Sequence, residues 1–456
     1  MQAPVISGFR QLEPAPRRFL FFVAVNVVSW QNIVGPAMVL FARKIDMPES
    51  LVGLLISFMP FAQLLLLVTM PLVTRFGPKR VMLWAWFSRN LICCIVFTMP
   101  FALRAGDRRV AWMVLTVAIL GFCVMRAVGS GGWLPWLHEI VPDDRRSVYF
   151  STETAVTQVI NIAIMFVQAW LLAGSNPSIA RFLIIYAIGI AMGFMSLITM
   201  SRIHGGEPFA ERPSFRDEVG AYVSAFCNGP YLRFMLTATF CISSMSWFGS
   251  AAVMYMRDML KLHDSMTMTV SAVASVGVLL TVAPWGRFTE HSGSGRAMFK
   301  SLTGHALSAV LMLVLPLEGP WRAAGAGAAM TLAAVFCSAF MVAANRSMLN
   351  QTPEDKRIGY TAAWTVCTSM AYGITPLLAG ILIEHFRLPG FRTCFAIAVA
   401  TGFAGAVSCL YVVPEGTATR PTVASVLHPS AMTRTLARIA AITLGLHESN
   451  RDDRKG

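Results

Sequence analysis

The chain has 456 residues, of which 55% are hydrophobic and only 13% charged, and its mean hydropathy is +0.60. Soluble domains carry roughly 25% charged residues, so this chain has too few charges to cover a water-exposed surface. The net charge of +14 does not indicate nucleic-acid binding, because the lysines and arginines gather in the connections on one side of the predicted membrane segments.

Twelve apolar segments have the length that a helix needs to cross a bilayer, about 20 residues. They cover residues 19–41, 51–74, 81–103, 110–136, 153–173, 181–200, 233–256, 267–286, 298–317, 322–345, 360–384 and 391–413. The runs are continuous, whereas strands of a membrane barrel alternate over about 10 residues. We therefore expect an all-α membrane protein with twelve transmembrane helices.

The chain repeats itself at a nearly constant spacing. The charged connection EIVPDDRRSVYF (139–150) aligns without gaps with NQTPEDKRIGYT (350–361), 211 residues later. The turns at Gly77 and Gly293 repeat at a spacing of 216, and the starts of the two halves, RFLFFVAV and RFMLTATF, at 215. An even number of spans separates equivalent points, which predicts two parallel, pseudo-symmetric six-helix bundles. Transporters use this architecture and bind their substrates between the halves.

The repeat divides the chain into five parts. These are an N-terminus (1–18), a first bundle (19–200), a central loop (201–232), a second bundle (233–413) and a C-terminal tail (414–456). Roughly two-thirds of the 37 lysines and arginines fall on the side that holds the central loop and both termini. Positively charged loops stay in the cytoplasm, so we expect a multi-pass protein of the cell (inner) membrane with both termini cytoplasmic. In the tail, the basic stretch Met432–Leu446 suits either a helix on the inner membrane surface or a disordered segment.

These residues resemble the major facilitator superfamily over about residues 18–413. The family's G-x-x-x-D-R-x-G-R signature between helices 8 and 9 is matched by Gly286, Glu290, Gly293 and Arg296. Its E-x-x-P-x-x-x-R pattern between helices 4 and 5 is matched by Glu139, Pro142 and Arg146. The first copy of the former signature departs from the family, with Thr74 in place of an acid. The resemblance implies a secondary transporter that works by alternating access and is not an enzyme.

The charged residues at the cytoplasmic helix ends predict a gate of ion pairs between the halves. Exposed pairs contribute ~0–1 kcal/mol each, and a few kcal/mol suffice to bias a two-state equilibrium. The candidates are Glu139, Arg145, Arg146, Arg75, Glu290, Arg346 and Arg357. The alternative is that these are solvated loop charges that fix the topology.

Polar residues inside the spans predict the substrate site. Arg126 lies roughly ten residues from the end of its span, about 15 Å, which is far for snorkelling. We therefore expect it to bind an anionic group or to tune a proton step. For Arg89 and His305 we expect structural roles, with snorkelling as a further option for Arg89. The expected substrate-binding residues are Arg126, Asn26, Trp30, Gln31, Asn161, Trp247 and Trp364. The alternative for the polar members is hydrogen bonding that holds the helices together.

No acid lies near the middle of a predicted span, which leaves open exchange, facilitated diffusion, or a proton step through Glu153 or His305. No residue spacing suggests a catalytic, metal or cofactor site. We therefore expect a monomeric secondary transporter of a small organic anion. Its partners are the solute and the lipid bilayer, with protons as an optional coupling ion. The alternatives are a non-transporting sensor or assembly partner of the same fold, and a proton-coupled exporter of drugs or metabolites.

Overall fold

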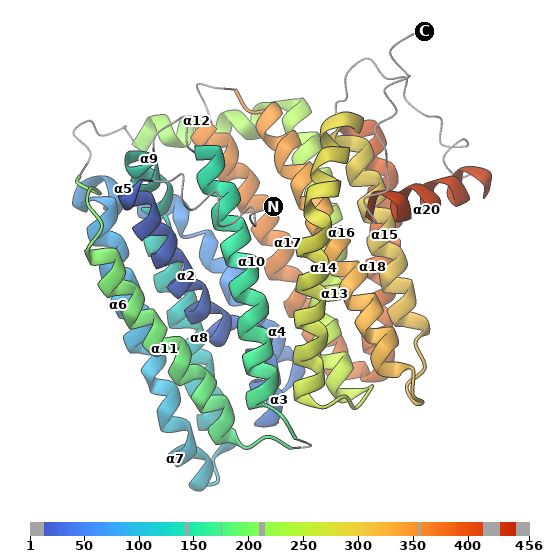
Figure 1. The fold of residues 1–456 in the computed structure, drawn as a ribbon, viewed down its shortest axis with the longest axis horizontal. Coiled ribbons are helices and arrows are strands. Elements are labelled where there is room, and N and C mark those ends of the chain that lie inside the picture. The colour runs from blue at the N-terminus through green and yellow to red at the C-terminus, as the bar shows by residue number, and fades with distance from the viewer. Residues whose placement is uncertain are drawn as a thin grey trace.

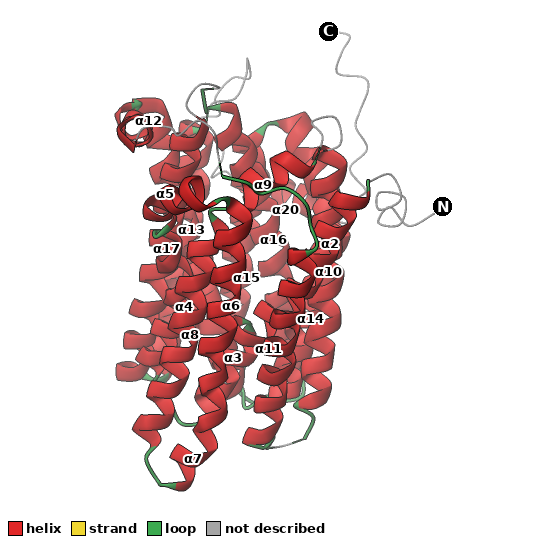
Figure 2. Cartoon of the chain, turned by 90° about the vertical axis from the view of Figure 1, so that its left-hand side faces the viewer, coloured by secondary structure: helices red, strands yellow, loops and turns green. Residues whose placement is uncertain are grey.

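The structure is a computed structural model, which describes residues 13–141, 146–174, 176–208, 215–353, 357–413 and 429–443. In these residues every regular element is a helix (Figures 1 and 2). Eleven helices are long and apolar enough to cross a membrane. The segment predicted at 51–74 is the twelfth and is built of two shorter helices, α4 (Glu49–Gln63) and α5 (Leu66–Phe76). The predicted twelve-helix fold class is confirmed.

The first half starts with α2 (Pro14–Val34) and α3 (Pro36–Lys44), which together form the first span. They are separate because Gly35 is extended, as is favoured before a proline. After α4 and α5 come α6 (Pro78–Cys93), the 3-10 turn η1 (Cys94–Thr98), α7 (Met99–Arg104), α8 (Arg108–Ser130), α9 (Trp133–Ile140), α10 (Arg146–Leu171) and α11 (Ile179–Ser201).

The second half contains α13 (Gly229–Asp258), α14 (Asp264–Ser292), α15 (Ser294–Val314), α16 (Arg322–Asn350), α17 (Arg357–Phe386) and α18 (Leu388–Val412). The linker helix α12 (Phe215–Cys227) joins the halves, and α20 (Pro429–Thr443) follows the second one. Figure 1 shows α12 at the top of the bundle and α3 and α7 at the bottom. We call these the linker end and the far end.

The tail helix α20 packs against α14 and α15. Its Ile439 and Ile442 are buried in the core of the second half. Of the two alternatives for the basic stretch, the structure shows a helix as far as Thr443, and residues 444–446 lie outside the described residues.

The backbone repeats the sequence symmetry. Gly77 and Gly293 both have a φ near +85° (84° and 85°), in turns that separate equivalent helices. Asp46 and Lys261 share a left-handed conformation at φ 56° and 54° in the turns at the other end. Glycine is required at position 77, because a Cβ there would lie 2.7 Å from the Gly206 carbonyl oxygen. The two halves therefore have the same turns in the same places.

The halves meet along two symmetry-related helix pairs, α4 with α17 and α10 with α14. In the first pair the backbones touch toward the far end. A Cβ on Gly53 would lie 2.2 Å from the Pro376 carbonyl oxygen, and one on Gly380 would lie 2.5 Å from that of Glu49. Small residues allow this close approach between membrane helices.

Candidate functional site

Arg126 lies on α8, four residues before that helix ends at Ser130 and not the ten predicted, and its side chain is partly exposed. Its Nη1 donates to the Met59 Sδ at 2.8 Å, and its Cζ lies 5.8 Å from the centre of the Trp30 ring. A thioether is a weak acceptor, and an aromatic face attracts but does not neutralise a cation. Among the described residues no carboxylate pairs with Arg126. Its guanidinium therefore keeps most of its donors for another group.

Arg89 on α6 is fully buried, so it does not snorkel to a membrane surface. Its Nη2 donates to the Asn26 Oδ1 at 2.7 Å, and its Cζ lies 4.4 Å from the Trp86 ring and 4.8 Å from the Phe122 ring. Its Nε and Nη1 have no hydrogen-bond partner in the described part of the chain. Arg89 thus joins three helices but remains a buried cation without an anion.

Asn26, predicted to bind substrate, faces α6 instead. Its Oδ1 accepts from both Arg89 and the Trp86 Nε1, the latter at 2.9 Å, and the residue is 5% exposed. Of the two interpretations given above, these contacts support hydrogen bonding between helices. Trp86 and Phe122 carried no sequence signal for this role, because aromatic residues in apolar spans are common.

Arg89 and Arg126 are close enough for their positive charges to repel each other, and we call them the arginine pair. Asn26 on α2 and Phe122 on α8 contact Arg89. Trp30, four residues after Asn26 on the same face of α2, contacts Arg126, four residues after Phe122 on the same face of α8. The two helices run in opposite directions, so these contacts cross between them.

Helix α10 supplies polar groups beside α2. The Gln168 Nε2 donates to the Asn32 Oδ1 at 2.9 Å and to the Gln31 carbonyl oxygen at 3.3 Å. Gln31 is 2% exposed and the Oδ1 of Asn161 is also buried, although Asn161 itself is only partly so. Gln31 therefore lies between helices, whereas Asn161 remains a candidate for the site.

A pocket of about 290 Å³ opens between α9 and α10 toward the linker end. It is lined by Trp133, Phe150, Glu153, Thr154, Thr157 and Gln158. Glu153, which the sequence analysis considered for a proton step, is one of its walls. The carboxylate, hydroxyl and amide groups that line the pocket belong to α10, the helix that also carries Asn161.

The candidate residues of the second half are buried. Trp364 stacks on Phe234, with ring centroids 5.5 Å apart and planes 7° apart, and is 6% exposed. Trp247 is 9% exposed within the main apolar core. His305 is 1% exposed, with its Nδ1 3.4 Å from the Ala333 carbonyl oxygen. These contacts are those of core residues.

The predicted linker-end gate is described only in part. Arg145 lies outside the described residues, and the side chains of Arg146 and Arg357 are not described. The Glu139 Oε2 accepts from the Gly206 amide at 2.8 Å, within the first half. Arg346 donates to the Thr289 carbonyl oxygen within the second half.

Arg75 and Glu290, two further members of the predicted gate, have exposed side chains. Arg75 lies over the neighbouring Phe76 ring, with its Cζ 5.2 Å from the centroid. Within the described chain neither residue forms an ion pair. The gate at this end therefore stays a prediction.

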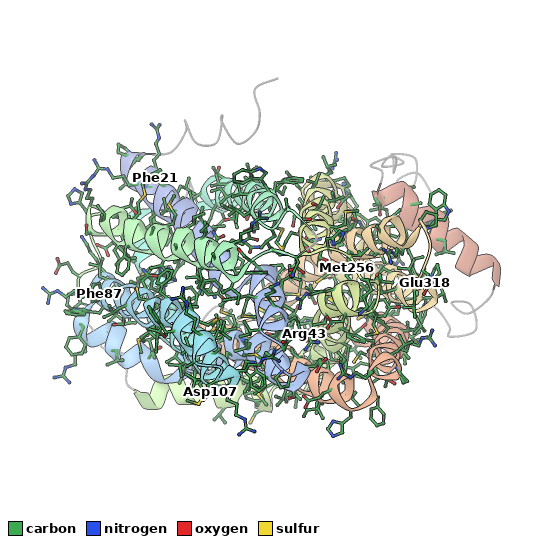
Figure 3. The ribbon with its side chains drawn as sticks, turned by 90° about the horizontal axis from the view of Figure 1, so that it is seen from below. Phe21, Arg43, Phe87, Asp107, Met256 and Glu318 are labelled. Atoms are coloured by element: carbon green, nitrogen blue, oxygen red, sulfur yellow. The ribbon has the colours of Figure 1, made fainter. Side chains whose placement is uncertain are left out.

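Ion pairs between the halves lie at the far end, where none was predicted from the sequence. The Arg43 Nε is 2.9 Å from the Asp258 Oδ2, and its Nη2 is 2.9 Å from the Glu49 Oε1. Glu49 also pairs with Arg387 at 3.4 Å. Figure 3, viewed from the far end, shows Arg43 near the boundary between the halves. We call these four residues the far-end latch.

A backbone contact adds to the latch. The Ser50 amide donates to the Glu384 Oε2 at 3.0 Å, which joins the start of α4 to the end of α17. The repeat spacing contained a signal for the latch. Arg43 and Asp258 stand at equivalent positions, as do the acids Glu49 and Asp264, each 215 residues apart. Equivalent residues of opposite charge, such as Arg43 and Asp258, can form an ion pair across a pseudo-twofold axis.

Comparison with known proteins agrees with this architecture. The family model described as Major Facilitator Superfamily matches residues 234–443, and the one described as Sugar (and other) transporter matches residues 9–205. No curated protein matches the sequence.

Solved structures with the same fold include three transporters. The D323A mutant of the nucleoside transporter NupG matches with a TM-score of 0.67 and 12% identity, over 88% of this chain and 100% of that one. A bacterial homologue of the iron transporter ferroportin in the inward-facing state matches at 0.64 and 13%, over 88% and 99%. A bacterial homologue of the human lysosomal transporter Spinster, inward-facing and unoccupied, matches at 0.59 and 12%, over 91% and 96%. The chain belongs to the major facilitator superfamily and is a secondary transporter, not an enzyme.

Proposed function

We propose that the protein moves a small organic anion across the inner membrane by alternating access between its two halves, with both termini in the cytoplasm. The observation that carries the substrate class is Arg126, a partly exposed guanidinium beside Met59 and Trp30 without a carboxylate partner among the described residues. A buried or half-buried cation costs several kcal/mol in a membrane unless a ligand compensates it. An anionic substrate provides that compensation, and a guanidinium binds it through two parallel hydrogen bonds.

The named cargoes of the structural neighbours fit this site less well. A nucleoside carries no net charge and an iron ion is positive, so neither would compensate Arg126. Identities of 12–13% leave the substrate free to differ within the same fold.

The conformation fits alternating access with the outer side shut. With cytoplasmic termini the far end faces outward, and there the Arg43–Asp258 and Glu49–Arg387 pairs hold the halves together. In this proposal the latch breaks when the outer side opens, and linker-end charges such as Glu290 and Arg357 form the opposing gate.

Flux into proteoliposomes tests the function. Radiolabelled organic anions are offered to vesicles that contain the wild-type protein, Arg126→Gln or Arg109→Gln. Arg109 is the matched control, because it lies on the same helix and its side chain is exposed. We expect saturable flux that Arg126→Gln reduces at least 100-fold and Arg109→Gln leaves unchanged. Binding without flux for every anion would point to a sensor, and equal flux in all three proteins would refute the role of Arg126.

Topology is tested separately. A C-terminal reporter that is active only in the periplasm should be silent, and activity of that reporter would refute the cytoplasmic termini.

A further inference from the structure

The arginine pair carries more positive charge than a monoanion can compensate. Arg126 has a thioether and an aromatic face as its described contacts, and Arg89 has one amide oxygen and two aromatic faces. Guanidinium groups do not lose their proton in proteins. In the described structure these two neighbouring cations therefore have no acid among their contacts.

A purely structural role explains Arg89 poorly. Packing between α2, α6 and α8 needs volume and one donor for Asn26, which an uncharged side chain can supply. The side chain instead brings a full charge and leaves Nε and Nη1 without partners at zero exposure. Unpaired buried donors are costly, and a buried charge without a partner more so. Retaining them is reasonable if a ligand bound at Arg126 uses the charge.

We propose that the site takes a phosphate-type dianion attached to a flat apolar body, with Arg126 binding the head group and Arg89 providing the second charge from behind. This inference rests on the proposed anion site at Arg126 and names its substrate class. Arg126 is the contact residue because it is partly exposed, whereas Arg89 is enclosed by Asn26, Trp86 and Phe122. Arg89 is thus a positioning residue, which acts through its field and by fixing Asn26 and α8.

The apolar body follows from the walls of the site. Trp30 and Met59 flank the guanidinium of Arg126 and are themselves partly exposed. A ring can stack on an indole face, and a flexible thioether adapts to its shape. Free phosphate has the same head-group chemistry but no ring to contact Trp30 or Met59.

Three benzene derivatives of similar size but different head-group charge test the effect of charge on binding. Phenylphosphonate is a dianion at about pH 8.5, above the second ionisation of a phosphate-type group. Benzenesulfonate is a monoanion, and benzenesulfonamide is neutral. Inorganic phosphate serves as the fourth probe and tests whether the ring matters. Binding to the full-length protein in detergent is measured by calorimetry, so the result does not depend on transport.

In the wild-type protein we expect phenylphosphonate to bind about tenfold more tightly than benzenesulfonate, and benzenesulfonamide to bind too weakly to measure. A factor of this size is what one further unit charge near the site contributes at an effective dielectric constant near 20. Arg89→Met should bring the phosphonate-to-sulfonate ratio close to one while both anions still bind. Arg89→Lys, which keeps the charge, should restore most of the ratio. Arg126→Gln should abolish binding of both anions.

Asn26→Asp provides a variant that does not remove Arg89. A carboxylate at this position would neutralise Arg89 in place, so the ratio should again fall toward one in a stably folded protein. The proposal is overturned if the ratio is unchanged in Arg89→Met and Asn26→Asp, if all ligands weaken by the same factor, or if phenylphosphonate does not bind. Binding in the expected order without flux in vesicles would refute the transport function and leave this inference standing.

Discussion

Arg43 and Asp258 occupy equivalent positions of the two halves, 215 residues apart, and their side chains form an ion pair 2.9 Å long across the boundary between them. Pseudo-symmetry brings equivalent residues together near the axis, so a pair of opposite charges there links the halves directly. The side chains are 14% and 18% exposed, which limits screening by water. Arg43 also bonds the Met47 carbonyl oxygen at 2.7 Å and is therefore held in place.

Asp258→Asn should loosen the far end without disturbing Arg43 and Glu49. A hydrogen bond between charged groups contributes about 1.5–3 kcal/mol, so we expect the equilibrium to shift about tenfold or more toward an open far end. Spin labels at Arg104→Cys and Glu318→Cys, exposed positions in the two halves, report the change as a population at longer distance. Cys227, the exposed native cysteine among those described, is replaced by serine in this background.

The Arg108–Asp46 pair is the matched control for that experiment. It lies at the same end but within the first half, and both side chains are 66% exposed. Arg108→Gln should leave the label distance unchanged, because exposed pairs contribute little. If Arg108→Gln and Asp258→Asn have the same effect, the latch is not specific.

Gly53→Ala should weaken the same end by a different route. The added Cβ would lie 2.2 Å from the Pro376 carbonyl oxygen, so α4 and α17 must separate. Overpacking of this kind costs about 1–3 kcal/mol. We expect a lower melting temperature together with a larger open population by the label distance. Gly249→Ala on α13 is the control, since nothing lies within 4 Å of its added Cβ, and it should raise stability slightly because glycine is unfavourable inside a helix.

Asn26→Leu should destabilise the protein more than Asn26→Asp. Leucine removes the acceptor of Arg89 and Trp86, which leaves a buried cation with no described hydrogen bond and costs about 1.5–3 kcal/mol. Aspartate keeps the acceptor and adds an opposite charge. Thermal unfolding in detergent distinguishes the two variants. Equal melting temperatures would show that Asn26 does not support Arg89.

The sequence predicted the fold far better than the site. The twelve apolar segments and the repeat can be read directly from segment length and residue spacing. The left-handed turns at Gly77 and Gly293 follow the predicted repeat. Side-chain direction is different. Asn26 and Trp30 share a helix face, yet one bonds Arg89 on α6 and the other lies beside Arg126 on α8. The spacing of residues within one helix does not indicate which neighbouring helix each side chain contacts.

The last prediction separates two roles for Glu139. As a gate residue it would need its charge, so Glu139→Gln would impair transport as much as Glu139→Ala. The structure instead shows its Oε2 accepting from the Gly206 amide, and glutamine keeps an acceptor oxygen. We expect Glu139→Ala to speed hydrogen exchange of the Gly206 amide about tenfold, which corresponds to ~1.4 kcal/mol, and Glu139→Gln to have a smaller effect. Asn350→Ala, at the equivalent position of the second half, is the control and should leave this amide unchanged. Transport lost in Glu139→Gln with unchanged exchange at Gly206 would assign Glu139 to the gate.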